Sequence, residues 1–186
     1  MVEHWAKTGG RFLLKWMIAC SAGMVATVAF PRAPGSMNDA RSEGRMTYDD
    51  NNVFAKILRG ELPCHKVHET DRILAFMDVM PRGDGHVLVI PKAKARNLLD
   101  IGPDDLAELA KAVQVVGKAA KAALSADGLT VQQFNESAGG QVVFHIHFHV
   151  IPRFDGVPLK PHTGQMEKPE TLAELAARIR AALPAG

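Results

Sequence analysis

The sequence predicts an α+β fold with an antiparallel sheet of about five strands, and three observations indicate this class. Two strand-like runs, residues 66–68 and 73–78, are joined by a four-residue turn, which is too short for a parallel crossover. A third run of branched residues, 86–90, ends at a proline. Two stretches with apolar residues at helical spacing, 103–126 and 168–182, predict a long helix and a C-terminal helix.

A short helix is predicted before the first strand, at residues 52–59. The polar run Asp49–Asn51 can cap this helix, and Gly60 marks its end. We therefore expect the folded part of the chain to begin with a short N-terminal helix.

Strand-like patterns return after the long helix. Residues 129–135 predict a fourth strand, and the Ser-Ala-Gly-Gly sequence at 137–140 predicts a loop. In residues 143–151, which follow that loop, histidine alternates with large apolar residues. Strand side chains alternate between two faces, so a strand here would present three histidines on one face and its apolar residues to the core.

Composition and charge narrow the class of protein. The chain has 186 residues, of which 47% are hydrophobic and 23% are charged, as expected of a globular domain that buries a core. The net charge is +2 and the sequence has no basic stripe, so we expect no nucleic-acid partner. Cys20 and Cys64 form no CxxC motif and are too few for a disulfide scaffold; Cys64 is interpreted as an inert thiol.

The first 45 residues differ from the rest of the chain. Basic residues precede an apolar run at 16–30, which is typical of a signal-peptide core and short for a membrane span. Residues 31–45 show no periodicity and predict a flexible linker. Met37 and Met46 are plausible alternative starts, so residues 1–45 are interpreted as an over-extended start rather than as a leader.

The alternating histidines, His145, His147 and His149, allow two kinds of chemistry. A single zinc ion cannot easily bind all three, because the first and third would lie roughly 13 Å apart along a strand. A two-histidine metal site would need another ligand brought by the fold, such as His86 or His162. Nucleophilic and acid–base catalysis fits the pattern better, since a neutral imidazole is nucleophilic near pH 7 and its neighbours can donate protons.

The glycine-rich loop before the histidines indicates what they act on. Gly139 and Gly140 allow backbone N–H groups to approach an anion closely. Alone, such a pair of glycines is usually a turn. Beside three histidines, it favours a bound phosphate that is attacked in line.

Several ordered stretches then carry a resemblance to a known family. His145–Ile151 alternates histidine with hydrophobic residues and closes with two hydrophobic residues. It is preceded in the family's order by residues 52–63, 74–81 and 85–92, and by Asn135 with Gly139–Gln141 at the nucleotide-contacting loop. Together these stretches resemble the histidine triad (HIT) family over most of residues 46–155, which also supports Met46 as the natural start.

The resemblance implies a HIT-like fold, a homodimer whose sheets join into one continuous sheet, and a purine nucleotide site in each subunit. It implies a hydrolase or transferase that cleaves at the α-phosphate of nucleoside 5′-phosphoramidates or related nucleotides without a cofactor. His147 would attack the phosphorus and form a nucleotidyl-histidine intermediate that water hydrolyses. His149 would hold the phosphate and pass a proton to the leaving group. His145 would orient the others, and His86 would complete a proton relay.

The resemblance also assigns the nucleotide contacts. It implies that Asp78 binds the ribose hydroxyls and that Phe54 and Phe76 line the base pocket. The ribose and phosphate would be held by Asn135, Gly140, Gln141, Val142 and Val143. From the residues alone, other roles stay open. The phenylalanines could be ordinary core, Asp78 could be a turn residue, and His86 could be a satisfied histidine at a strand end.

Two departures from the family pattern bear on metal binding and on turnover. Many bacterial relatives hold zinc between two cysteines of the opening helix and two histidines farther on. Here Asn52, Ala55 and Lys94 stand at three of those positions, so we expect no metal. Val142 stands where some members place a phosphate-binding serine, which puts efficient turnover in doubt. A nucleotide-binding regulatory module with vestigial activity is therefore the alternative function.

The chain is thus expected to have three segments: an N-terminal extension at 1–45, a HIT domain at 46–155, and a C-terminal loop with an amphipathic helix at 156–186. The folded domain is expected in the cytoplasm, without membrane contact. The C-terminal segment, in which His162 is the chemically interesting residue, would shape the leaving-group side. The sequence does not identify the physiological substrate.

Overall fold

The computed structural model describes residues 47–161 and 165–185 of the 186-residue chain. The expectations for residues 1–45 and for His162 lie outside the described residues. In the described part of the chain, no helix has the length and apolar character needed to cross a membrane.

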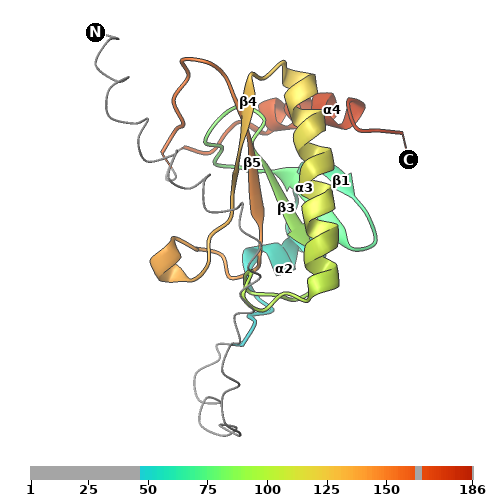
Figure 1. Cartoon of the computed structure of the whole chain (residues 1–186), viewed down its shortest axis with the longest axis vertical. Helices are drawn as coiled ribbons and strands as arrows, with labels where there is room; N and C mark the ends of the chain where they lie inside the picture. Colours follow the sequence, from blue (N-terminus) through green and yellow to red (C-terminus); the bar gives the residue numbers. More distant parts are fainter. Residues whose placement is uncertain (1–46, 162–164, 186) are drawn as a thin grey trace, which may run out of the picture. The chain divides into compact units, whose positions relative to one another are not determined.

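The described residues form three α-helices, a 3₁₀ helix and five strands (Figure 1). The helices are α2 (Val53–Leu58), α3 (Pro103–Leu124) and α4 (Pro169–Ala181), and the 3₁₀ helix η1 is Ser137–Gly139. The strands are β1 (Lys66–Glu69), β2 (Ile73–Met77), β3 (Val87–Pro91), β4 (Gly128–Gln132) and β5 (Phe148–Arg153). They form one antiparallel sheet in the order β1-β2-β3-β5-β4. The predicted α+β class, with a short first helix, a long helix and a C-terminal helix, is confirmed.

The sheet has a hydrophobic core on each face. Every residue of β2 and β3 is buried, which is typical of strands that are covered on both sides. Val87 and Val89 join the core beneath α3 and α4. Leu88 and Ile90 point the other way, into a second core that includes Phe54 of α2. Figure 1 shows α3 lying along one face of the strands, which leaves the α2 face for the site.

The pairing of β4 with β5 decides which side chains face the site. Val131 lies opposite Val150, and Gln132 lies opposite His149. Cross-strand partners share a face of the sheet. Val150 belongs to the core beneath α3, so His149 and Gln132 both point to the opposite face.

The first helix begins at Val53, because Asn52 is its N-cap. The Asn52 side-chain oxygen accepts hydrogen bonds from the N–H groups of Phe54 at 3.0 Å and Ala55 at 2.9 Å. These bonds satisfy helix-end donors that have no acceptor within the helix. Both residues are buried, so the cap helps to hold the buried side of α2 against the sheet.

The strand that carries the histidines is shorter than predicted. β5 begins at Phe148, so His149 lies in the sheet while His145 and His147 precede it. The Ile146 N–H donates to the Ala95 carbonyl at 2.9 Å, so this part of the chain pairs with a loop rather than with β3. The prediction of one strand face for all three histidines is therefore wrong. The alternation persists locally, since Ile146 is buried in the core beneath α3.

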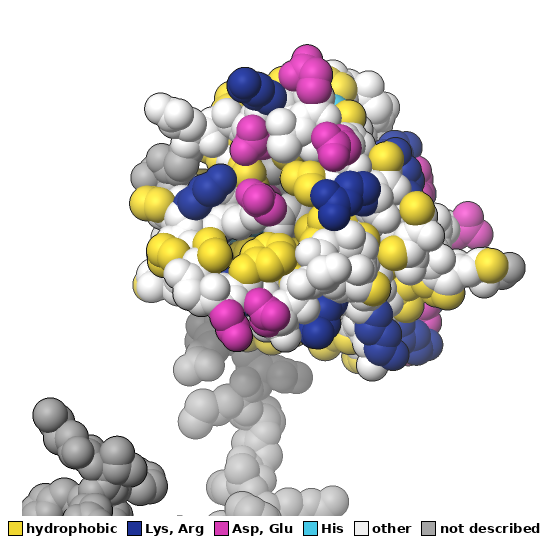
Figure 2. Space-filling view, turned by 90° about the horizontal axis from the view of Figure 1, so that it is seen from above, with side chains coloured by type: hydrophobic (Ala, Val, Ile, Leu, Met, Phe, Trp, Pro, Cys, Tyr) yellow, Lys and Arg dark blue, Asp and Glu magenta, His cyan; other side chains and the backbone are white. Residues whose placement is uncertain are grey.

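Charged side chains of both signs are mixed on the surface. Figure 2 shows acidic and basic side chains interspersed over one face of the molecule. This distribution agrees with the net charge of +2 and gives no single-sign patch on that face for a polyanion.

Two glycines with positive φ differ in their surroundings. Gly85, between β2 and β3, has φ +78°, and a Cβ there would lie 2.2 Å from Leu124 Cδ1 of α3 and 3.2 Å from Pro152 Cγ. Gly60 has φ +76°, but a Cβ there would meet nothing within 4 Å. Comparing the two positions therefore separates backbone strain from steric contact.

We predict that Gly60→Ala lowers the free energy of unfolding by about 1 kcal/mol, because only the positive φ is penalised. Gly85→Ala should lower it by about 2–3 kcal/mol, since contact with Leu124 and Pro152 adds to the same backbone strain. Urea unfolding of both variants measures the difference. Equal losses would show that the Leu124 side chain moves aside and that only backbone strain is penalised at residue 85.

Candidate active site

A pocket of about 660 Å³ opens on the face of the sheet opposite α3. This volume is in the range of small-molecule sites. The lining residues are Val53, Phe54, Ile57, Pro63, Cys64, Phe76, Met77, Asp78, Val79, Met80, Leu88, Phe134, Gly140, Val142, Val143, His147 and His149. Most of the residues predicted for the site therefore meet in one pocket, with an apolar end and an imidazole end.

His147 is oriented by a backbone carbonyl. Its Nδ1 lies 2.7 Å from the carbonyl oxygen of His145, which can only accept a hydrogen bond. Nδ1 of the neutral ring therefore carries the proton, and Nε2 carries the lone pair. His147 is 7% exposed and lines the pocket, so Nε2 is the nucleophilic atom that this ring offers.

His86 and His149 form a buried pair. His86 Nε2 lies 2.9 Å from His149 Nδ1, and the Arg82 N–H donates to His86 Nδ1 at 3.2 Å. Because this N–H needs a lone pair at Nδ1, the proton of neutral His86 sits on Nε2 and is donated to His149. The proton of neutral His149 is then on Nε2, which makes His149 a proton donor.

Asp78 touches this pair and also fixes a turn. Its Oδ1 accepts from the Met80 N–H at 2.9 Å, so the turn role that the sequence left open is present. Its Oδ2 lies 3.4 Å from His86 Nδ1. The carboxylate can therefore accept from Nδ1 in place of the Arg82 N–H contact when the histidine pair takes up a proton.

His145 lies behind His147 and is fully buried. Its Nε2–H donates to the Pro91 carbonyl at 2.9 Å, and the Tyr48 hydroxyl donates to its Nδ1. Burial lowers the pKa of His145 to about 4, although the bond to Pro91 opposes this effect. His145 is thus neutral at pH 7 and adds no positive charge beside the nucleophile. Tyr48, 97 residues away in sequence, was missed because no local pattern links the two.

The apolar end of the pocket is built on α2. Phe54 lies edge-on to His147, with ring centroids 5.0 Å apart, and edge-on to Phe76 at 5.6 Å. Cys64 lines the same end, and burial raises the pKa of its thiol, so the thiol stays protonated at neutral pH. Aromatic edges and aliphatic walls beside an imidazole suit a planar base.

The glycine-rich loop uses part of its backbone to hold its own shape. The Gly140 N–H donates to the Ser137 carbonyl, and the Gln141 N–H donates to the Glu136 carbonyl, both at 3.0 Å. Gly140 has φ +89°, which suits glycine. These two N–H groups are engaged within the turn. The next residues, Val142 and Val143, line the pocket.

Gln141 and Asn135 lie outside the pocket lining. Gln141 is 4% exposed; its side-chain nitrogen donates to the Arg96 carbonyl at 2.6 Å, and its oxygen accepts from the Glu136 N–H at 2.8 Å. The Asn135 oxygen accepts from the Leu98 N–H at 2.9 Å. Both side chains therefore organise the loop from within.

Arg96 and Glu136 form an ion pair that holds the glycine-rich loop, and the sequence did not reveal it. Arg96 donates to Glu136 at 3.2 and 3.0 Å, and Asn97 adds a bond at 2.7 Å. The bonds from Arg96 lower the pKa of the Glu136 carboxyl. Glu136 has φ +60°, a strained conformation for a residue with a side chain, so these bonds hold an unfavourable backbone in place. Partners about 40 residues apart leave no local signal in the sequence.

One group among the described residues could hold a metal ion. The ligand atoms of Asp78, His86 and His149 lie within 4.8 Å of one another. The two histidine nitrogens are 2.9 Å apart in a direct hydrogen bond. Nitrogens that share a tetrahedral zinc ion at about 2.1 Å would lie about 3.4 Å apart. The geometry of this group is therefore that of a directly hydrogen-bonded histidine pair beside a carboxylate.

The positions where many bacterial relatives hold zinc have other roles in this chain. Asn52 is the cap of α2, and Ala55 is buried. Lys94 pairs with Asp50 at 2.7 Å. These residues do not fit a metal centre.

Comparison with known proteins agrees with this geometry. The model of the HIT domain matches residues 59–156. The protein is a member of the HIT family. Its fold is similar to that of a Hit-like protein involved in cell-cycle regulation from Bartonella henselae, at 51% identity and TM-score 0.72, over 74% of this chain and 100% of that one.

Two further relatives place the chain in the family. A hypothetical histidine triad nucleotide-binding protein from Sulfolobus tokodaii is 36% identical, with TM-score 0.64, over 69% of this chain and 89% of that one. Adenylylsulfatase HINT3 from Arabidopsis thaliana is 38% identical over 119 residues, which are 64% of this chain. The present chain spans 60% of the length of that relative.

The buried, neutral His145 links stability to pH. A histidine in an unfolded chain takes up a proton near pH 6.5, whereas folded His145 does so near pH 4. Because the folded pKa is the lower one, the unfolded state binds more protons between these values. The free energy of unfolding therefore falls as the pH drops from 6.5 toward 4, by about 2 kcal/mol between pH 7 and pH 5.

We predict that His145→Gln loses this part of the pH dependence, while the amide of the new side chain still offers a donor to the Pro91 carbonyl. The difference in free energy of unfolding between wild type and variant should shrink by about 2 kcal/mol from pH 7 to pH 5. Urea unfolding of both proteins at the two pH values measures it. A difference that stays constant with pH would contradict the neutral, buried His145.

Proposed function

We propose that this HIT protein is a hydrolase or transferase that cleaves at the α-phosphate of purine nucleoside 5′-phosphoramidates or related nucleotides. The observation that carries the proposal is the bond from His147 Nδ1 to the His145 carbonyl, which puts the lone pair on Nε2. His149, the proton donor, lies beside it, with ring centroids 5.0 Å apart. A nucleophile next to a proton donor is the pairing that nucleotidyl transfer requires.

The base and ribose would bind toward the apolar end of the pocket. Phe54 and Phe76 would contact the base, because they form the aromatic wall beside His147. Asp78 would accept from the ribose hydroxyls, since it lines the same pocket as that wall and its carboxylate lies 3.4 Å from His86 Nδ1. The nucleotide would thereby place its α-phosphate at the imidazoles.

The phosphate would meet the end of the glycine-rich loop. The N–H groups of Gly140 and Gln141 donate hydrogen bonds within the turn. We therefore assign the phosphate contacts to the backbone of Val142 and Val143. Gln141 and Asn135 would act through the loop that they hold rather than by touching the nucleotide.

The reaction starts from a singly protonated His86–His149 pair. In this form Asp78 accepts from His86 Nδ1–H, and His149 holds a proton on Nε2. His147 Nε2 attacks the α-phosphorus, the bond from phosphorus to the leaving group breaks, and an amine leaving group takes the proton from His149. Water then attacks the nucleotidyl-histidine and returns its proton to His149. The bonding electron pair returns to His147 Nε2.

The names of the relatives support this class of chemistry. The Arabidopsis relative is called an adenylylsulfatase. The Sulfolobus protein is called a hypothetical nucleotide-binding protein. Both names are consistent with an α-phosphate held between the base pocket and the histidines.

We also propose that the protein is a homodimer joined through β4. This strand is at one edge of the sheet, and its Leu129 and Val131 are 37% and 48% exposed. Pairing of β4 with its copy would cover these side chains and make one continuous sheet. Sedimentation equilibrium should give twice the 20.1 kDa chain mass; a monomer at all concentrations would rule this out.

A regulatory nucleotide-binding module is the second candidate function. Val142, a residue that is 84% exposed, supplies no hydroxyl at the phosphate end of the pocket. Affinity for AMP and turnover of a phosphoramidate, measured on the same preparation, separate the two candidates. Tight binding with negligible hydrolysis would favour the module.

We predict that wild-type protein mixed with adenosine 5′-phosphoramidate gains an AMP adduct on His147, detectable by mass spectrometry after an acid-free quench. His147→Ala should form no adduct and should lose activity by on the order of 10³-fold or more, because the nucleophile is removed. His68→Ala, a change on β1 away from the pocket, is the matched control and should retain both. Full activity of His147→Ala would show that the mechanism is wrong.

A further inference from the structure

The segment at residues 135–146 contains the glycine-rich loop and the backbone to which the phosphate is assigned. It lies along residues 95–98, in the loop between β3 and α3. Contacts join the two segments at the start, in the middle and at the end of 135–146: the Leu98 N–H with the Asn135 oxygen, the Arg96 guanidinium with Glu136, the Gln141 amide with the Arg96 carbonyl, and the Ile146 N–H with the Ala95 carbonyl. Residues 95–98 therefore help to fix the shape of the loop.

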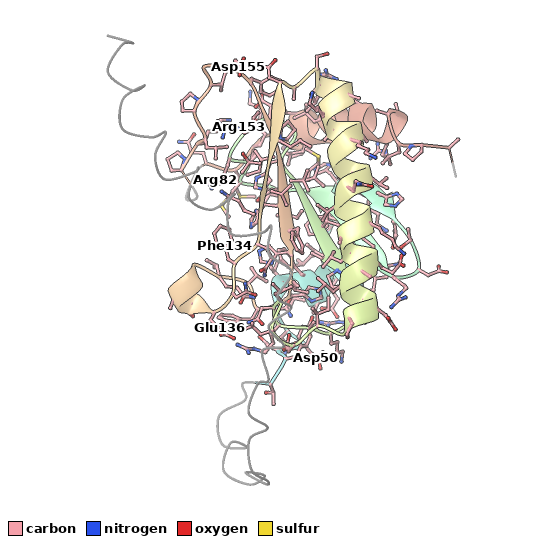
Figure 3. The ribbon with its side chains drawn as sticks, in the orientation of Figure 1. Asp50, Arg82, Phe134, Glu136, Arg153 and Asp155 are labelled. Atoms are coloured by element: carbon pink, nitrogen blue, oxygen red, sulfur yellow. The ribbon has the colours of Figure 1, made fainter. Side chains whose placement is uncertain are left out.

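Arg96 contacts both ends of the glycine-rich loop. Its guanidinium donates to both oxygens of Glu136, and its Cζ lies 5.2 Å from the centroid of the Phe144 ring. In Figure 3, Glu136 is labelled beside the loop that carries η1, at the end of the sheet where α2 lies. Only 9% of the Arg96 side chain is exposed. A planar guanidinium can pair with a carboxylate in its plane while its face lies against an aromatic ring.

A second pocket, of about 390 Å³, borders the phosphate end of the loop. Its lining residues are Thr47, Asp49, Asn52, Val53, Arg96, Val142, Val143 and Phe144. Val142 and Val143 line both this pocket and the catalytic one, whereas Arg96 lines only the second of the two. The backbone at 142–143 therefore borders open space on two sides, so close packing does not fix its position. Arg96 can act on a nucleotide only through this loop.

The backbone of Glu136 links Arg96 to the phosphate end of the loop. Glu136 has φ +60°, a strained conformation that its side-chain bonds hold in place. Its carbonyl accepts from the N–H groups of Gly139 and Gln141, both at 3.0 Å. If the side chain of Glu136 were released, relaxation of φ would turn this carbonyl and move the two N–H groups with it. Val142 follows directly, so the phosphate contacts would shift as well.

We propose that Arg96 is the positioning residue for the phosphate end of the site. By holding Glu136 in its strained conformation, it sets the position of the backbone at 142–143 that receives the α-phosphate. This inference rests on the proposed function and concerns the same site. Because Arg96 lies outside the catalytic pocket, it matters for the phosphate and not for the base and ribose.

The test compares the Kd values of AMP and adenosine, which differ only in the phosphate, by isothermal titration calorimetry. Arg96→Gln removes the paired bonds to Glu136 and should weaken AMP binding about 10-fold, because a displaced loop misplaces its donors. Its affinity for adenosine should stay at the wild-type value. Arg96→Lys keeps a cation near Phe144 but not the planar fork, and should recover part of the loss.

Glu136→Gln separates positioning from charge. This variant keeps the shape of the side chain and makes the site more positive. If Arg96 acted only by its charge, Glu136→Gln would bind AMP more tightly than the wild type. If Arg96 acts by holding the loop, Glu136→Gln should bind AMP more weakly and leave adenosine unaffected. This second variant also supplies the test if Arg96→Gln does not fold, which urea unfolding would show.

Arg72→Gln is the matched control, because Arg72 pairs with the Asp105 carboxylate at 2.7 Å, away from the loop. It should keep both wild-type affinities. Arg96→Gln that loses affinity for AMP and adenosine equally, or for neither, would overturn the role of Arg96 and leave the proposed function in place. So would tighter AMP binding by Glu136→Gln. Wild-type protein that binds neither compound would instead overturn the proposed function, and the inference with it.

Discussion

The bond from His147 Nδ1–H to the carbonyl of His145 is the interaction on which the site depends. An isolated imidazole exchanges its proton between two nitrogens, and only one tautomer offers a lone pair at Nε2. A carbonyl within the same short segment selects that tautomer without any second side chain. The selection works because the backbone at 145–147 precedes β5 and is not paired with β3, so the His145 carbonyl is available to the ring.

The groups around His147 keep positive charge away from its ring. His145 lies directly behind the nucleophile, and a positive charge there would draw electron density from His147. Burial with bonds to Tyr48 and Pro91 keeps His145 neutral. In the proposed mechanism the positive charge is carried by the His86–His149 pair, where the Asp78 carboxylate lies 3.4 Å from His86 Nδ1. In the proposed mechanism the two halves of the site therefore differ in protonation because their surroundings differ, although the four residues to which it gives catalytic roles are all histidines.

Most of the fold and much of the site could be predicted from sequence periodicity and motif order. The branched runs, the two amphipathic stretches and the histidines have local signatures, whereas Phe54 and Phe76 were assigned to the site through the family resemblance. The end of the sheet at Phe148 could not be predicted, because it depends on the bond from Ile146 to Ala95, a loop distant in sequence. Tyr48 and the Arg96–Glu136 pair were missed for the same reason. Gln141 stands at the position of the family's nucleotide-contacting loop, yet its side-chain amide forms hydrogen bonds with backbone groups of Glu136 and Arg96.

The tautomer of His147 tests the account most directly. Two-dimensional ¹⁵N–¹H NMR of histidine-labelled protein at pH 7, with the His147 signals assigned by their loss in His147→Asn, reports which ring nitrogen is protonated. The account predicts a protonated Nδ1 and an unprotonated Nε2 for His147. A protonated Nε2 with an unprotonated Nδ1 would contradict it, because no lone pair would then be available to attack the phosphate.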